Sequence, residues 1–167
     1  MPHSFNMSVE SPASVEQFLS AFGNEDYWRA RLVIGDGAAE LKSLTIDADG
    51  TVSVVVAATL VRNRLPKLIT QLHRADLEVV QNEKWSWIDG GRLRGEISLA
   101  APPIPLSGFW EALVTPVRNG SRLNYKATVI VNIPLVGGTI ERSIGGQLAE
   151  GIAKGVPFTT EWIAENG

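Results

Sequence analysis

An alternating pattern of large and polar residues opens the chain. The larger side chains occupy every second position from His3 to Val9, and serine, asparagine or glutamate fills the positions between them. A period of two places successive side chains on opposite faces of a β-strand. The pattern therefore predicts an amphipathic strand at the start of the chain.

Two short helices are predicted directly after this strand. Ser14 and Gln17 have the spacing of a capping box, in which each side chain accepts from the backbone N–H of the other residue. Apolar residues at helical spacing follow, and Gly23 ends the pattern. A second helical segment, over residues 25–32, carries one tyrosine and one tryptophan.

Three pairs of β-rich segments follow, and each pair is joined by a short turn. Asp49-Gly50, Asp89-Gly90-Gly91 and Asn119-Gly120 are turn sequences of the kind that closes β-hairpins. Parallel strands would instead need long crossover connections. The pattern therefore predicts an antiparallel meander of six strands. They cover residues 41–47, 51–61, 76–88, 92–101, 108–117 and 122–133.

The segment between the first two hairpins has a helical pattern. Residues 65–72 carry leucine or isoleucine at i, i+3, i+4 and i+7, which predicts a short amphipathic helix. Arginine and lysine give residues 62–74 a positive charge. Such a helix could cover a cavity mouth, attract an acidic ligand or contact a membrane transiently. A solvated helix at the end of the sheet explains the same pattern.

The chain is predicted to be helical after Pro134. Isoleucine or leucine recurs every fourth residue from Ile140 to Ile152, which defines one apolar face, and Leu148 lies on it. Pro157 is expected to break or kink this helix. Each interior glycine costs about 1 kcal/mol relative to alanine. Close approach to the sheet, or space for a ligand, would explain the glycines between residues 137 and 155.

The order of these elements predicts the fold class. The apolar face of the meander needs a cover, and the last helix is the only element long enough to provide it. We therefore expect an α+β helix-grip fold, in which a curved antiparallel sheet of about seven strands wraps round the long C-terminal helix. Two short helices follow the first strand. The length of 167 residues fits one domain over residues 1–167.

Composition excludes several kinds of chemistry. The chain has no cysteine, two histidines and five tryptophans, so disulfides, thiolate nucleophiles and cysteine-ligated metals are ruled out. The net charge of −3 argues against a general affinity for nucleic acid. No stretch approaches the apolar length of a membrane span, and the N-terminus lacks the features of a secretory signal. We expect a cytoplasmic protein with no metal, no cofactor and no stable membrane insertion.

Two parts of the chain resemble the START-like superfamily, which includes lipid-transfer domains, pollen-allergen-like proteins and polyketide cyclases. SPASVEQFLSAFGNEDYWRARL is similar to the opening helices of that superfamily. IPLVGGTIERSIGGQLAEGI and the later FTTEWI resemble an uncharacterised actinobacterial branch, a domain of unknown function. The resemblance covers nearly the whole chain and implies a cavity for a hydrophobic molecule between the sheet and the C-terminal helix. Its motifs are structural, and no catalytic motif carries over.

Candidate ligand contacts lie on one face of the strand over residues 76–88. Trp85 and Trp87 are two residues apart, so both point to the same face, where they could stack on a flat or acyl ligand. Core packing would explain the same spacing. Glu83 and Gln81 share this face, and a carboxylate in an apolar cavity could anchor a ligand or act as an acid–base group. A position at a strand end, beside water or arginine, is the alternative for Glu83.

Further candidates lie on the last two strands and the C-terminal helix. Alternation leaves open whether Trp110 or the pair Phe109 and Glu111 faces the cavity. Tyr125 is the one residue in the apolar set of the last strand that has a hydroxyl group. It could donate a hydrogen bond to a ligand, or it could pack in the core. Leu148 is the candidate contact from the helix.

The leading functional hypothesis is a carrier, transfer protein or sensor for a small hydrophobic molecule, whether lipid, polyketide or aromatic. The rival is a cyclase- or dehydratase-like enzyme that uses the same cavity as an orienting template. It needs at least two acid–base groups converging there, from Glu83, Glu111, Tyr125 and His73. A protein-binding module is a third option, but residues 92–98 make the outer face too polar. The scarcity of catalytic side chains favours the binding protein.

Overall fold

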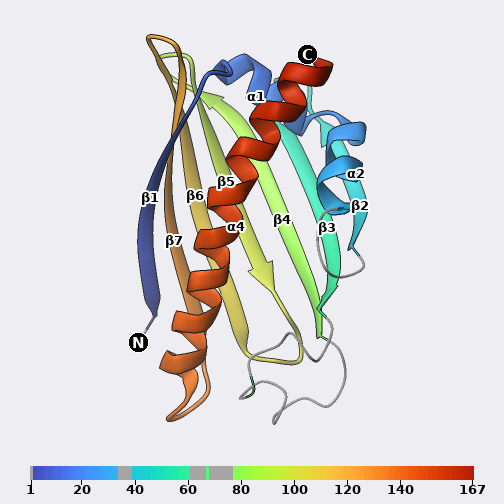
Figure 1. The fold of residues 1–167 in the computed structure, drawn as a ribbon. Helices are drawn as coiled ribbons and strands as arrows, with labels where there is room; N and C mark the ends of the chain where they lie inside the picture. The colour runs from blue at the N-terminus through green and yellow to red at the C-terminus, as the bar shows by residue number, and fades with distance from the viewer. Residues whose placement is uncertain (1, 34–38, 61–66, 68–76) are drawn as a thin grey trace.

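The computed structural model describes residues 2–33, 39–60, 67 and 77–167 (Figure 1). The strands and helices follow the predicted order, and their ends lie within two residues of the predicted ones. Of the helix expected over residues 65–72, only residue 67 is described, so this expectation falls outside the described residues in all but that position. The elements are β1 (His3–Ser11), α1 (Val15–Phe22), α2 (Glu25–Val33), β2 (Ala39–Ile46), β3 (Val52–Leu60), β4 (Leu77–Ile88), β5 (Arg92–Ala100), β6 (Leu106–Val117), β7 (Gly120–Val131) and α4 (Gly137–Asn166).

The strands form one antiparallel seven-stranded sheet in the order β1-β7-β6-β5-β4-β3-β2. The meander of six strands is therefore confirmed. β1 completes the sheet by pairing with β7, in a register that runs from His3 opposite Val129 to Ser11 opposite Ser121. This pairing joins two segments far apart in the sequence, and no turn signal along the chain indicates it.

The short helices pack their apolar faces against the sheet. Ser14 and Gln17 form the expected capping box, with Ser14 N donating to Gln17 Oε1 at 2.8 Å and Gln17 N donating to Ser14 Oγ at 3.2 Å. α1 buries Phe18 and Phe22 in the main core. The cap and the apolar spacing together explain why the chain turns helical at this point.

α4 crosses the concave face of the sheet diagonally and contacts β1, β7 and α1 (Figure 1). This arrangement confirms the helix-grip expectation. Its first turns are joined to β7, because Val131 N donates to Glu141 Oε2 at 2.8 Å. At Gly145 the helix approaches β1 so closely that a Cβ atom would overlap the His3 ring. Close approach to the sheet therefore explains this glycine.

The helix continues through Pro157 to Asn166, so the break, one of the two outcomes expected at the proline, does not occur. A proline inside a helix costs about 3 kcal/mol, because it removes one backbone hydrogen bond and crowds the preceding turn. Val156 and Ile163 are buried on either side of it, and burying such a side chain contributes about 1.5–3 kcal/mol. Thr160 Oγ1 also donates to Val156 O at 2.9 Å. Packing of the flanking turns therefore offsets the proline.

The outer face of the sheet is polar along β5, and Glu111 of β6 pairs with it. Arg94 Nη2 lies 3.1 Å from Glu111 Oε2, and Arg94 Nε lies 3.5 Å from Glu96 Oε1. These groups are about half exposed, as expected for a face in water. Among the helices that the structure describes, none has the length and apolar character needed to cross a membrane.

Candidate functional site

A cavity of about 180 Å³ lies between the concave face of the sheet and α4. Strands β4 to β7 form its floor, α4 forms its roof, and α1 and α2 close one side. Aromatic rings supply much of its apolar wall, including Trp85 and Trp110 from the sheet and Phe22 from α1. The cavity therefore lies where the resemblance to START-like proteins implies one.

The structure brings most of the predicted contact residues together at this cavity. Glu83, Trp85, Trp110, Tyr125 and Leu148 all line it. Trp87 does not: it lies near the end of β4, outside the lining, and is 39% exposed. It shares the strand face of Trp85, but the cavity ends before Trp87. Alternation gives the face of a strand residue and not its position along the cavity, which is why this placement needs correction.

The choice left open on β6 is decided in favour of Trp110. Trp110 is buried and lines the cavity, whereas Phe109 is 53% exposed. Glu111 lies on the outer face, where it pairs with Arg94. Glu111 is therefore removed from the possible acid–base groups of the cavity, and His73 lies outside the described residues.

Trp85 is held in place from three sides. Its indole stacks on Phe22 with ring centroids 4.4 Å apart. Its Nε1 donates to Glu83 Oε1 at 3.0 Å. Gly95 lies opposite it on β5, and a Cβ atom there would overlap the indole ring. The glycine provides the space that the tryptophan occupies, so one wall of the cavity is preorganised.

Glu83 is a buried carboxylate whose two oxygens already have donors. It is only 5% exposed. Oε1 accepts from Trp85 Nε1, and Oε2 accepts from Gln81 Nε2. A buried charge needs such partners, because desolvation is otherwise very costly. Glu83 therefore fixes two neighbouring side chains of the cavity wall.

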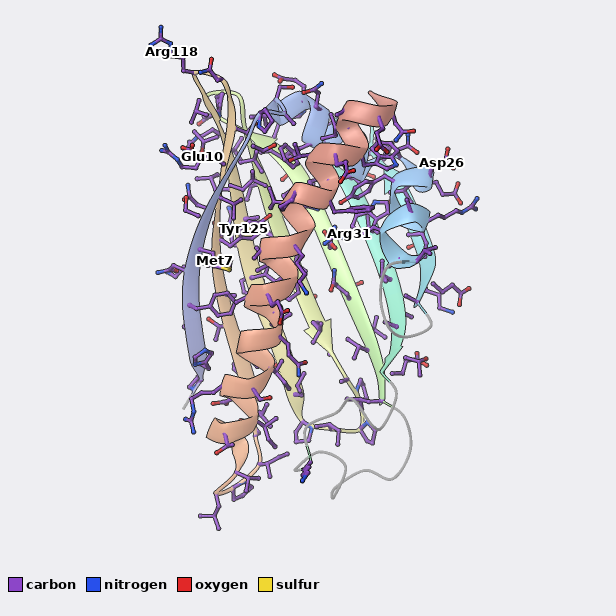
Figure 2. All side chains as sticks on the ribbon, in the orientation of Figure 1. Met7, Glu10, Asp26, Arg31, Arg118 and Tyr125 are labelled. Carbon is purple, nitrogen blue, oxygen red and sulfur yellow. The ribbon has the colours of Figure 1, made fainter. Side chains whose placement is uncertain are left out.

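Arg31 is a cavity residue that the sequence reasoning missed. It extends from α2 toward the space between α4 and the sheet (Figure 2) and lines the cavity. Its Cζ lies 5.1 Å from the ring centroid of Trp28, close enough for a cation–π contact. Its spacing of four residues from the buried Tyr27 was the available signal, since that spacing places both on one helix face.

A directional chain of hydrogen bonds connects Arg31 to α4. Thr159 Oγ1 donates to Gly155 O at 2.9 Å, so its hydroxyl accepts from the Tyr27 hydroxyl at 2.6 Å. The Tyr27 oxygen in turn accepts from Arg31 Nη1 at 3.2 Å. A hydroxyl has one proton to donate, which fixes this order. The chain holds α2, α4 and the guanidinium in one arrangement.

The electrostatics of the cavity keep Arg31 charged and Tyr125 neutral. Burial lowers the pKa of Arg31. The interactions with Tyr27, Glu83 and Tyr125 together raise the pKa by more than burial lowers it, so the pKa lies above its ordinary value. Burial raises the pKa of Tyr125 well above its ordinary value of 10.0, and the opposing effect of Arg31 is weaker. At neutral pH the cavity therefore contains a guanidinium cation and a protonated phenol.

The cavity reaches the surface along α4. Gln147 and Gly151 line it and are both exposed, which places its mouth beside them. A Cβ atom on Gly151 would meet nothing within 4 Å, and one on Gly155 would lie 3.7 Å from Arg31 Nη2. Space beside a cavity, the second explanation given for the glycines of this helix, therefore fits these two positions.

A family model described as "Protein of unknown function (DUF2505)" matches residues 6–163. The chain belongs to this family. An uncharacterised protein of Mycobacterium tuberculosis, Rv0481c, is 37% identical over 173 residues, and the match covers 99% of each chain. Mycobacteria are actinobacteria, so this relative agrees with the branch that the sequence resembles.

Solved structures show which fold this DUF2505 protein adopts. The crystal structure of Ara h 8.0201 matches with a TM-score of 0.59 at 14% identity, over 99% of this chain and 100% of that one. Norcoclaurine synthase from Thalictrum flavum, in complex with dopamine and hydroxybenzaldehyde, matches with a TM-score of 0.57 at 14% identity, over 100% and 89%. The START-like helix-grip fold is thereby confirmed.

The described residues offer no evident metal site. No three histidine, cysteine, aspartate or glutamate side chains among them gather closely enough to hold an ion. The cavity is instead lined by the polar side chains of Arg31, Glu83, Tyr125, Thr159 and two glutamines. These groups are suited to hydrogen bonding and charge recognition of an organic molecule.

Proposed function

We propose that this protein binds a small hydrophobic molecule in the cavity beneath α4, as a carrier, transfer protein or sensor. The observation that carries the proposal is the wall of the cavity, in which preorganised aromatic rings surround a few buried polar groups. Ligand sites commonly combine apolar surface with a small number of placed polar groups. Norcoclaurine synthase, a protein of the same fold, is described in complex with two small aromatic molecules.

Intrinsic tryptophan fluorescence tests this function directly. Trp85 and Trp110 line the cavity, so a ligand seated there should change their emission saturably. Titrations would use single-ring aromatic compounds, a fatty acid and a multi-ring aromatic compound. Saturable binding of at least one class supports the proposal. Emission that no class changes, together with no shift of the melting temperature, contradicts it.

An enzyme acting in the same cavity is the second candidate, because Glu83 and Tyr125 both line it. A carboxylate and a phenol on one cavity are suited to proton transfer at a bound molecule. Proton NMR of the bound aromatic compound in D2O would detect C–H exchange or product formation. Exchange that Glu83→Gln abolishes while binding persists supports the enzyme. A ligand that stays unchanged leaves the binding protein as the function.

The remaining parts of the functional hypothesis stay predictions. The transient membrane contact through residues 62–74 falls mainly on residues outside the described ones. We also propose a cytoplasmic location and binding without a nucleic-acid partner, in line with the composition and the net charge of −3. Localisation of the tagged protein in its host tests the cytoplasmic location directly.

A further inference from the structure

We propose that the cavity selects a small aromatic carboxylic acid, whose carboxylate binds Arg31 and Tyr125 while its ring lies among Trp85, Trp110 and Phe22. This inference rests on the proposed function and specifies the ligand class for the same site. It follows from the size of the cavity, the unused donors of Arg31 and the neutral phenol opposite it. Each of these limits the ligand in a different way.

The size of the cavity limits the ligand to about one ring. The volume is about 180 Å³. An engineered cavity of about 150 Å³ holds benzene, whereas sites for drug-sized ligands measure roughly 300–1,000 Å³. A single aromatic ring with a short polar group therefore fits. A long acyl chain or a polyketide of several rings exceeds this space and would have to extend through the mouth beside Gly151, which favours the smaller ligand among the classes that the sequence left open.

The charge on Arg31 favours an acid. A guanidinium carries five N–H donors, and among the described residues Arg31 uses one of them, on the Tyr27 hydroxyl. None of the ion pairs between described residues involves Arg31. The paired donors of a guanidinium match the two oxygens of a carboxylate in geometry and in charge. A bound carboxylate would give this cation a charged partner.

Glu83 does not fill that role in the structure. Its two oxygens accept from Trp85 and Gln81, and it forms no ion pair with Arg31. It is close enough to raise the pKa of Arg31, and a guanidinium is charged at neutral pH in any case. Glu83 therefore favours the charged form of Arg31 and leaves the N–H donors of the guanidinium available.

Tyr125 supplies a second donor from the opposite wall. It extends from β7, on the other side of α4 from Arg31 in Figure 2. Its hydroxyl forms no hydrogen bond with another described residue, and it stays protonated because burial raises its pKa. A neutral phenol donates to a carboxylate oxygen. Arg31 and Tyr125 together would orient an acid that the aromatic rings hold by its apolar part.

The test compares benzoate and phenylacetate with their neutral analogues, benzyl alcohol and benzamide. Affinities would be measured by calorimetry and tryptophan fluorescence on the full chain. Hydrogen bonds to charged groups contribute about 1.5–3 kcal/mol, which corresponds to roughly ten- to a hundredfold in affinity. We expect the acids to bind the wild type at least about tenfold more tightly than the neutral analogues. Arg31→Met should remove this preference, because it weakens binding of the acids about tenfold or more and weakens binding of the neutral compounds far less.

Arg29→Met is the matched control. Arg29 lies on the same helix, but it is exposed and pairs with Glu25 at 2.6 Å. This variant also removes one positive charge and should keep the preference for acids. Tyr125→Phe should weaken binding of the acids several-fold and weaken binding of benzyl alcohol less, because a neutral hydroxyl is the weaker acceptor. Binding of the neutral compounds by Arg31→Met shows that the cavity is still folded, and circular dichroism provides a second check.

The outcomes separate this inference from the proposed function. Equal affinity for acids and neutral analogues, or an acid preference that survives Arg31→Met, overturns the acid selectivity while ligand binding stands. Laurate binding as tightly as benzoate overturns the size limit. If no compound of any class binds, the proposed function itself fails.

Discussion

At the scale of single residues, the site depends on a few side chains whose positions are fixed by their neighbours. Trp85 stacks on Phe22, hydrogen-bonds to Glu83 and lies over the glycine opposite it. Each of these interactions is modest by itself, at about 0.5–1.5 kcal/mol. Together they fix the orientation of the indole, so a small substitution beside it should change the shape of the cavity wall.

Gly95→Ala should displace the Trp85 indole. The added methyl group would overlap the ring, and a crowded core typically loses about 1–3 kcal/mol. Chemical denaturation would measure the loss, and tryptophan emission would report the moved ring. Gly108→Ala on β6 is the control, because its Cβ atom would lie no closer than 3.7 Å to its neighbours. Equal effects of the two substitutions would contradict the steric explanation.

Tyr125→Phe should flatten the dependence of stability on alkaline pH. The folded state raises the pKa of this phenol above 10.0, mainly through burial. The associated stability is fully present below pH 10.0 and is lost as the pH rises above that value, because the unfolded chain releases the proton first. The wild type should therefore lose stability more steeply there than the variant. Denaturation series at several alkaline pH values measure the two slopes, and parallel curves count against this assignment.

At the scale of secondary-structure elements, α4 combines two uses of glycine. Gly145 permits close approach to β1, whereas Gly151 and Gly155 leave space beside the cavity. Gly146 is exposed, and a Cβ atom there meets nothing within 4 Å. The same residue type thus serves packing at one turn and access at another, and one position shows neither use.

Gly151→Leu should obstruct the cavity, and Gly146→Leu should not. Both substitutions replace an exposed helical glycine with a better helix former, so each should raise stability by about 0.5–1 kcal/mol. Only the side chain at Gly151 lies at the cavity, where it should weaken ligand binding at least about tenfold. Thermal unfolding and fluorescence titration measure the two effects. Equal ligand affinity in both variants would argue against a mouth beside Gly151.

At the scale of the whole molecule, contacts join the two ends of the chain. β1 pairs with β7, and Ser11 Oγ lies 2.6 Å from Thr160 Oγ1 of α4. Tyr27 connects α2 to the same helix through Thr159. The core beneath α4 is therefore built from the first and last parts of the sequence together, and neither part can bury its apolar face alone.

The chain should unfold in one cooperative transition. Because the sheet, α1 and α4 share one main core, losing α4 would expose the apolar face of the strands. Tryptophan fluorescence and far-ultraviolet circular dichroism should give the same midpoint in urea. A ligand at a concentration of a hundred times its dissociation constant should raise the free energy of unfolding by about 2.7 kcal/mol. Two separate transitions would count against a single domain over residues 1–167.

Much of the architecture was determined by the sequence itself. The apolar periods, the capping box at Ser14 and the three hairpin turns predict the order and bounds of the elements, because these signals act between near neighbours. The inward face of a strand also follows from its period of two where one face is clearly apolar, whereas on β6 the alternation left the inward face open. That is why Trp85, Glu83 and Tyr125 could be named from the sequence as candidates for the cavity, beside the alternative of core packing or a strand-end position.

Only the tertiary structure decided the pairing of β1 with β7, the extent of the cavity and the position of Arg31 in its lining. Each depends on segments that are distant in the sequence, and local periodicity contains no information about such distances. Trp87 has the right face and lies outside the cavity, whereas Arg31 lies on a helix with little apolar patterning and lines it. Pro157 shows the same limit, because packing on both sides of it offsets a strong local preference.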